Sequence, residues 1–148
     1  MRRVVKMDIR ELKQYNIDAI LGAVGAFLML VWHKTDGNLK KLKGNTEYFN
    51  KMIDADIEAY RAIAKAGHEI LPDDDKEFES DAYRKTCLRF FKLMCATRLG
   101  KICASDHAMS ATDEMSALNR DLEEFFDENG AEYPVWKELE KECGDYLK

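Results

Sequence analysis

Residues 19–32 read AILGAVGAFLMLVW and contain no charged side chain, although 34% of the chain is charged. A helix of this length rises about 21 Å, which is shorter than the roughly 30 Å hydrocarbon core of a membrane. Asp18 and His33 bracket the segment. We therefore expect no membrane span. The segment is instead predicted to form a fully buried central helix, apolar on all sides because other helices cover it.

The rest of the 148-residue chain also favours helices, because its apolar residues recur with a period near 3.6 and no stretch alternates as a half-buried strand would. Capping residues and turn-forming clusters separate the helices, and the connections between them are short. We predict an all-α fold in which residues 1–148 form a single-domain bundle of about six helices around the central apolar helix. Their approximate ranges are 8–15, 17–33, 46–67, 81–103, 110–129 and 134–147.

Charge is distributed in blocks, although the net charge of the whole chain is only -5. Residues 1–43 carry +5, residues 44–81 carry -7, residues 82–103 carry +6 and residues 104–148 carry -9. Since opposite charges attract, the simplest interpretation places basic and acidic helices side by side. A general nucleic-acid coat does not fit this pattern, so nucleic acid is the less expected partner.

The four cysteines include no Cys-x-x-Cys pair, and no secretory leader is evident. We therefore expect free thiols in a reducing, cytoplasmic compartment. Catalytic-serine, phosphate-loop and dinucleotide motifs are missing from the sequence, as are closely spaced metal ligands. No cofactor and no metal are predicted, and an enzyme is the less favoured class.

Two charged residues interrupt apolar stripes. Asp56 falls among the apolar positions of the 46–67 helix, and Arg98 falls beside the apolar face of the 81–103 helix. An unpaired buried charge is costly, so such residues are normally paired. We predict that Asp56 and Arg98 face each other, or that each meets another partner, as a buried charged pair with a structural role.

The run RAIAKAGH, residues 61–68, places an arginine and a histidine in a predicted helix with six residues between them. This spacing resembles the Arg-x(4–6)-His signature of HEPN ribonucleases, small helical proteins that cut RNA as dimers without metal. The resemblance implies that His68 would carry a proton and that Arg61 would stabilise phosphate charge, with both on one helix face. Ala62 follows the arginine, where that family often has a polar residue.

Two half-motifs support a second resemblance. An apolar helix ends in Thr35-Asp36-Gly37, and a similar helix ends in Ser105-Asp106-His107. Both resemble halves of the TerB (tellurite-resistance) all-helical domain. The second half lacks the glycine that the family has in this turn, and the first half lacks the family's acidic residues. The resemblance implies a stress-response domain that binds a divalent cation such as calcium. Its ligands would be Asp36, Asp106, Asp113 and Glu114.

One basic row remains on the 81–103 helix. Lys85, Arg89 and Lys92 flank its apolar face and would suit either an acidic partner or the acidic helix over 110–129. Aromatic residues that could stack on bases are not interleaved with this row. The leading hypothesis is a non-catalytic helical protein-interaction module, a regulator, adaptor or inhibitor that binds another protein through charged surfaces. Homodimerisation through an apolar helix face is compatible with the sequence.

Overall fold

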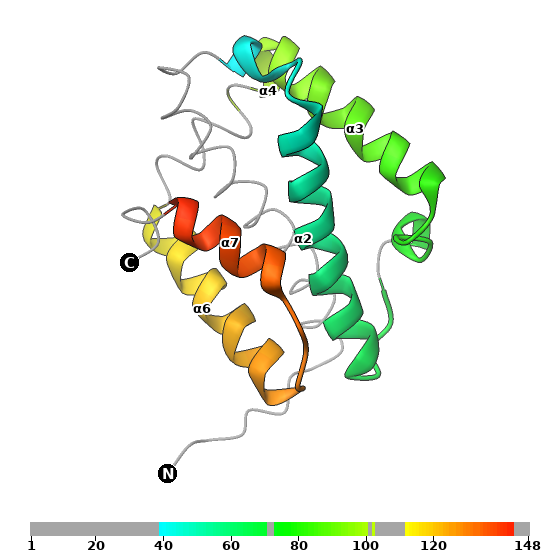
Figure 1. Cartoon of the computed structure of the whole chain (residues 1–148), viewed down its shortest axis with the longest axis vertical. Helices are drawn as coiled ribbons and strands as arrows, with labels where there is room; N and C mark the ends of the chain where they lie inside the picture. Colours follow the sequence, from blue (N-terminus) through cyan, green and yellow to red (C-terminus); the bar gives the residue numbers. More distant parts are fainter. Residues whose placement is uncertain (1–38, 71–72, 101, 103–111, 144–148) are drawn as a thin grey trace.

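The computed structural model describes residues 39–70, 73–100, 102 and 112–143, and within these ranges every regular element is helical (Figure 1). The all-α prediction is therefore confirmed for this part of the chain. The central helix expected over 17–33, and the short one expected over 8–15, lie outside the described residues. The elements are η1 (Leu39–Leu42), α2 (Thr46–Lys65), η2 (Asp73–Asp75), α3 (Asp81–Ala96), α4 (Arg98–Gly100), α6 (Thr112–Glu128) and α7 (Pro134–Cys143).

Helix α2 contributes more buried residues than any other described element. Asn45 caps its N-terminus, because Asn45 Oδ1 accepts the backbone N–H of Tyr48 at 3.1 Å. The sequence suggests Thr46 for this position, one residue later. The apolar residues that recur at helical spacing along α2 are buried apart from Ala64, which is exposed. The buried apolar residues of α2 are Phe49, Met52, Ile53, Ala55, Ile57, Ala59, Tyr60, Ala62 and Ile63.

The other helices lie on two sides of α2. In Figure 1, α3 lies on one side, while α6 and α7 lie on the other. The ring of Phe49 in α2 stacks on Phe91 of α3, with 5.7 Å between centroids. On the other side, Phe126 of α6 meets Trp136 of α7 edge to face at 5.5 Å, and both side chains are buried. The basic α3 and the acidic α6 are thus separated by α2 rather than placed side by side.

Two helices end in the same kind of glycine turn. Gly67, with φ of 85°, follows α2, and Gly130, with φ of 58°, follows α6. The backbone N–H of Gly67 donates to the carbonyl of Ala64, and that of His68 donates to Ile63, the pair of bonds that defines a Schellman turn. An equivalent pair closes α6. Both predicted helix ends are confirmed, and each turn directs the chain away from its helix.

The helix predicted over 81–103 is interrupted. Its start is as expected, since Ser80 Oγ accepts the backbone N–H of Tyr83 at 3.1 Å. α3 nevertheless ends at Ala96, because Thr97 is extended with φ of -116° and ψ of 153°. The chain then folds back so closely that a Cβ atom on Gly100 would collide with the backbone carbonyl of Met94. Ile102, whose spacing in the sequence would continue the apolar face of the predicted 81–103 helix, is 51% exposed.

No described helix has the length and the apolar content needed to cross a bilayer. The apolar segment 19–32 lies outside the described residues, so the structure does not test its predicted burial.

Candidate functional site

The predicted pair between Asp56 and Arg98 does not form. Asp56 is buried, with 5% of its surface exposed, but Arg98 is exposed and the two make no ion pair. The cause is the interruption at Thr97. If the helix had continued, Arg98 would lie on the same helix face as Phe91. Burial of Asp56 was correctly predicted, and its partner was not.

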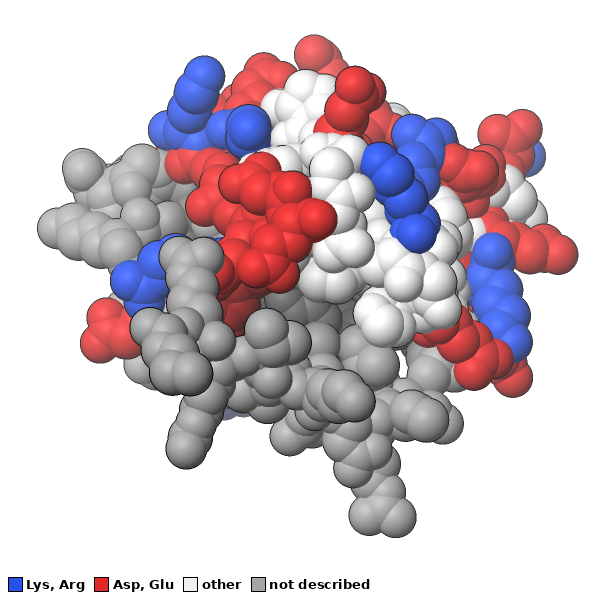
Figure 2. Space-filling view, turned by 90° about the horizontal axis from the view of Figure 1, so that it is seen from below, with Lys and Arg blue, Asp and Glu red and all other residues white. Residues whose placement is uncertain are grey.

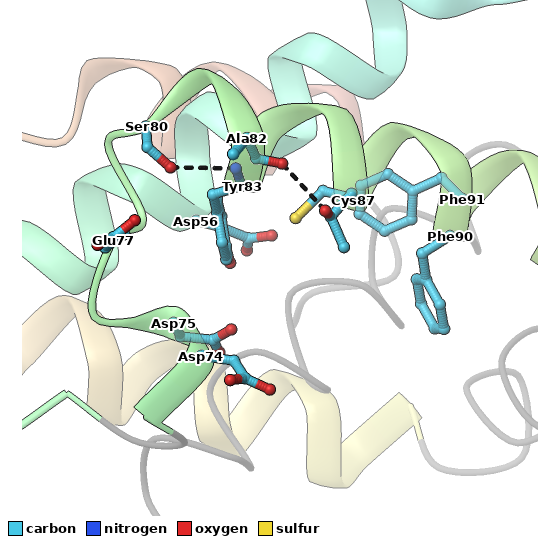
Figure 3. Close-up of a pocket in the computed structure, with 11 residues that line it drawn as sticks. Asp56, Asp74, Asp75, Glu77, Ser80, Ala82, Tyr83, Cys87, Phe90 and Phe91 are labelled. Carbon is cyan, nitrogen blue, oxygen red and sulfur yellow. Dashed lines mark hydrogen bonds between the residues drawn. The ribbon is translucent and has the colours of Figure 1, made fainter.

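Asp56 instead lies in the wall of a cavity of about 530 Å³ between α2, η2 and α3 (Figure 3). Figure 3 shows its carboxyl group between the Tyr83 ring and the Cys87 side chain, with Asp74 and Asp75 of η2 facing the same space. The described lining residues are Asp56, Asp74, Asp75, Glu77, Ser80, Ala82, Tyr83, Thr86, Cys87, Phe90 and Phe91.

The Oδ1 atom of Asp56 has no hydrogen-bond partner. Burial, and after it the negative charge of Asp75, raise the pKa of Asp56 to about 8. The carboxyl group is therefore mostly protonated at neutral pH, and both of its protonation states become populated near pH 8. A carboxyl group of this kind can act as a hydrogen-bond donor at neutral pH and as an anion above it.

The neighbouring tyrosine and cysteine side chains stay neutral. Tyr60 Oη donates to Asp75 Oδ2 at 2.6 Å. Burial is the main reason that the pKa values of Tyr60 and Tyr83 lie well above the usual phenol range, and burial likewise raises the pKa of Cys87. The Cys87 thiol is therefore not an activated nucleophile. Cys87 and Cys95 are free thiols, as expected.

The basic row predicted on the sequence is present on α3. Lys85 and Arg89 are exposed, and Lys92 is half-buried. None of the three forms an ion pair with another residue that the structure describes. Phe90 directly follows Arg89 and is 50% exposed, and Leu93 directly follows Lys92 and is 60% exposed.

Arg61 and His68 do not share a helix face, because α2 ends at Lys65 and His68 follows the Gly67 turn. Arg61 is exposed and forms an ion pair with Glu79. The half-buried ring of His68 lies 6.2 Å from that of Phe125. The geometry that the ribonuclease hypothesis expects, with both side chains on one helical surface, is not the one observed.

The carboxylates expected for a cation site cannot be compared as a set. Asp36 and Asp106 lie outside the described residues, as does the side chain of Glu114, while Asp113 is exposed near the start of α6. Among the residues that are described, no three His, Cys, Asp or Glu side chains come together in a way that could hold a metal ion. The cation-binding hypothesis stays a prediction.

The chain was compared with family models, with curated proteins and with solved structures, and none of them matches it.

The sequence pointed to Asp56 because a carboxylate on an apolar stripe is unusual, but it did not reveal the cavity. Asp73–Asp75 has the composition of an exposed acidic connection, and the hydrogen bond from Tyr60 to Asp75 brings that connection against α2. Such a contact between separate elements has no local signature in the sequence.

Proposed function

We propose that this protein is a non-catalytic helical interaction module that binds another protein through the outer side of α3. The observation that carries the proposal is the adjacency of basic and exposed apolar side chains on that helix. Lys85, Arg89 and Lys92 recur at intervals of four and three residues, which places them in one row. Phe90 and Leu93, which directly follow Arg89 and Lys92 in the sequence, are exposed as well. We call these five residues the α3 face.

Charges on the inner side of α3 are used differently. Arg84 pairs with Asp54 of α2 at 2.5 Å and donates to Asn50 Oδ1 at 2.9 Å. That arginine therefore joins two helices of the fold. The cations of the α3 face have no such acidic counterpart among the described residues. Ion pairs within this part of the fold therefore do not explain why basic residues lie there.

The acidic helix α6 is not that counterpart. It carries seven acidic residues and one basic residue, but it lies on the far side of α2 from α3 (Figure 1). Acidic side chains also outnumber basic ones on the described part of the face shown in Figure 2. The α3 face therefore differs in sign from α6 and from much of the described surface shown in Figure 2, which favours a partner of negative charge.

The chemistry of the α3 face suggests the form of the partner. Exposed aromatic and aliphatic side chains provide anchors for apolar contacts, and flanking cations select for carboxylates. An acidic amphipathic helix would satisfy both, with its apolar stripe on Phe90 and Leu93 and its Asp or Glu residues beside the basic row. Binding should weaken as salt is added, because screening acts on exposed charges.

Site-specific crosslinking tests the proposal. A photoreactive amino acid placed at Leu93 should crosslink a partner in the native cell, and the crosslinked peptide should be acidic with apolar residues at helical spacing. Reversing two charges in Lys85→Glu/Arg89→Glu should abolish capture. The matched control is Arg120→Glu/Lys141→Glu, which changes the net charge equally at two exposed positions on other helices. Equal capture by both double variants, or a crosslinked peptide that is basic, would refute the proposal.

A further inference from the structure

The cavity beside Asp56 differs from the basic row of the α3 face in the sign of its charge, although Phe90 belongs to both sites. Asp56, Asp74, Asp75 and Glu77 supply carboxyl groups to it, and no described lining residue is Lys, Arg or His. The opposite part of the wall is apolar and includes Phe90 and Phe91. A volume of about 530 Å³ lies in the range of sites for small organic molecules.

The acidic lining alone would not indicate a ligand, since acidic side chains are common on surfaces. The buried Asp56 is the independent observation. Its side chain is almost completely withdrawn from solvent, its Oδ1 atom has no partner, and it lies in the cavity wall (Figure 3). Buried polar atoms nearly always have a hydrogen-bond partner, and an unsatisfied one calls for an explanation. A ligand donor in the cavity would satisfy it.

The neighbouring donors do not fulfil this role. The hydroxyl group of Tyr60 is used by Asp75, at 2.6 Å. Arg84 of α3 is paired with Asp54 of α2 instead. The missing partner is therefore a group that carries an N–H or O–H donor, and a positive charge on it would also offset the four acidic residues.

We propose that this cavity binds a small organic ammonium ion. The N–H of the ligand donates to Asp56 Oδ1, and its apolar body packs against Phe90 and Phe91. The carboxyl groups of the cavity are not arranged to hold a metal ion. Among the described residues, no group of three His, Cys, Asp or Glu side chains has such an arrangement. A free small amine is the proposed ligand, rather than a lysine side chain of another protein, because an apolar body beyond the charged group is needed to fill the aromatic part of the wall.

Ammonium binding should be linked to the loss of a proton. An ammonium ion favours the ionised form of Asp56, whereas the carboxyl group is mostly protonated at neutral pH. If only the ionised form binds, the apparent affinity rises roughly fifty-fold between pH 6 and pH 8 and then levels off. The groups that face Asp56 are Tyr60 on α2, Asp75 on η2, and Tyr83 and Cys87 on α3. The two phenols and the thiol have raised pKa values, so they stay neutral over this pH range.

Calorimetry on the full chain tests the proposal, with 2-phenylethylammonium as the probe at pH 6 and pH 8. We expect binding at pH 8, a roughly fifty-fold weaker affinity at pH 6, and proton release that is visible when buffers of different ionisation enthalpy are compared. The neutral 2-phenylethanol and the N-trimethylated amine, which lacks an N–H donor, should bind at least tenfold more weakly. Nα-acetyl-lysine amide, which lacks the apolar body, should also bind more weakly.

Variants assign the effect to Asp56. Asp56→Asn should lose the pH dependence and at least tenfold of the affinity at pH 8, while the matched control Glu79→Gln, an exposed acid outside the cavity, should behave as the unmodified chain. Asp75→Asn provides a second route if Asp56→Asn does not fold. Because the charge of Asp75 contributes to the raised pKa of Asp56, this variant should shift the pH midpoint of binding downward.

Four results would overturn the proposal: no amine binding at millimolar concentration and pH 8, equal binding of the alcohol, unchanged binding by Asp56→Asn, or Asp56-dependent binding of calcium in place of the amine. Equal affinity for Nα-acetyl-lysine amide would overturn the assignment to a small molecule. The outcome does not depend on the basic row of the α3 face, because Lys85, Arg89 and Lys92 do not line the cavity, whereas Phe90 belongs to both sites.

Discussion

Glu58 of α2 caps the N-terminus of α7, where Glu58 Oε2 accepts the backbone N–H of Trp136 at 2.9 Å. The other carboxylate oxygen accepts the backbone N–H of Val135 at 3.0 Å. The two N–H groups belong to the first turn of α7, which has no partners of its own for them. Burial raises the pKa of Glu58, and these two hydrogen bonds act in the opposite direction. A buried carboxylate of one helix thus stabilises the start of another.

Removing this cap should destabilise the fold. We expect Glu58→Ala to lower the free energy of unfolding by about 2 kcal/mol, because two hydrogen bonds to a charged group are lost and two backbone N–H groups are left unsatisfied. Urea denaturation measures the loss, and hydrogen exchange should be faster at Val135 and Trp136. Glu132→Ala, at an exposed position just before α7, is the control. Equal losses in the two variants would show that the cap contributes little.

The stability of the protein should depend on the protonation of Asp56. Its pKa is about 8 in the folded chain, compared with an ordinary value of 3.8. The folded state therefore binds more protons than the unfolded state between these values, so stability is highest at the acidic end of this window and falls as the pH rises toward 8. The contribution of Asp56 to this slope is on the order of 1 kcal/mol per pH unit.

Asp56→Asn should flatten that slope, since the amide does not titrate. Thermal and urea unfolding between pH 5 and pH 9 provide the measurement. The slopes of stability against pH are compared, and not the absolute stabilities, because the buried amide has hydrogen-bonding needs of its own. Asp121→Asn, an exposed acid in α6, should retain the dependence of the unmodified chain. A slope that persists in Asp56→Asn would mean that another group causes it.

The glycine turns after α2 and α6 should resist substitution. Gly67 and Gly130 have positive φ values, and no atom lies close enough to either position to oppose an added methyl group sterically. Gly67→Ala and Gly130→Ala should each cost about 1 kcal/mol from backbone strain alone. Gly44→Ala is the matched control, because that position has open space and no positive φ. Chemical denaturation measures the free energy of unfolding of the three variants. An equal loss in Gly44→Ala would contradict the explanation by backbone strain.

Adjacent phenylalanines on α3 should behave in opposite ways. Phe91 is 4% exposed and stacks on Phe49, whereas Phe90 is 50% exposed. Phe91→Ala should lower the free energy of unfolding by about 3 kcal/mol or more, because it leaves a cavity in the core. Phe90→Ala should change it by less than about 1 kcal/mol. Urea denaturation compares them directly, and a large loss in Phe90→Ala would show that this side chain serves the fold rather than recognition.

The ribonuclease hypothesis makes a separate prediction. Because Gly67 turns the chain before His68, we expect the protein to leave RNA intact in the presence of a chelator. Incubation with labelled single-stranded RNA checks this. Cleavage that disappears in both Arg61→Ala and His68→Ala, with folding retained, would instead support a metal-independent ribonuclease.

The sequence alone determined the features that depend on neighbouring residues. The spacing of Phe49, Met52 and Tyr60 established the inner face of α2, and Ser80 and Gly130 marked a helix start and a helix end. These features are local, since a helix repeats every 3.6 residues and its caps act within one turn. Burial of Asp56 followed from the same periodicity.

Tertiary structure alone decided which side chains meet. The interruption at Thr97 displaced Arg98 from the face expected for it, and the carboxyl group of Asp56 came to line a cavity instead of an ion pair. Glu58 and Trp136, 78 residues apart, became partners only through the packing of α7 on α2. Hydrogen bonds and charge pairs act over a few ångströms, so their partners depend on the three-dimensional path of the chain, which local periodicity does not specify.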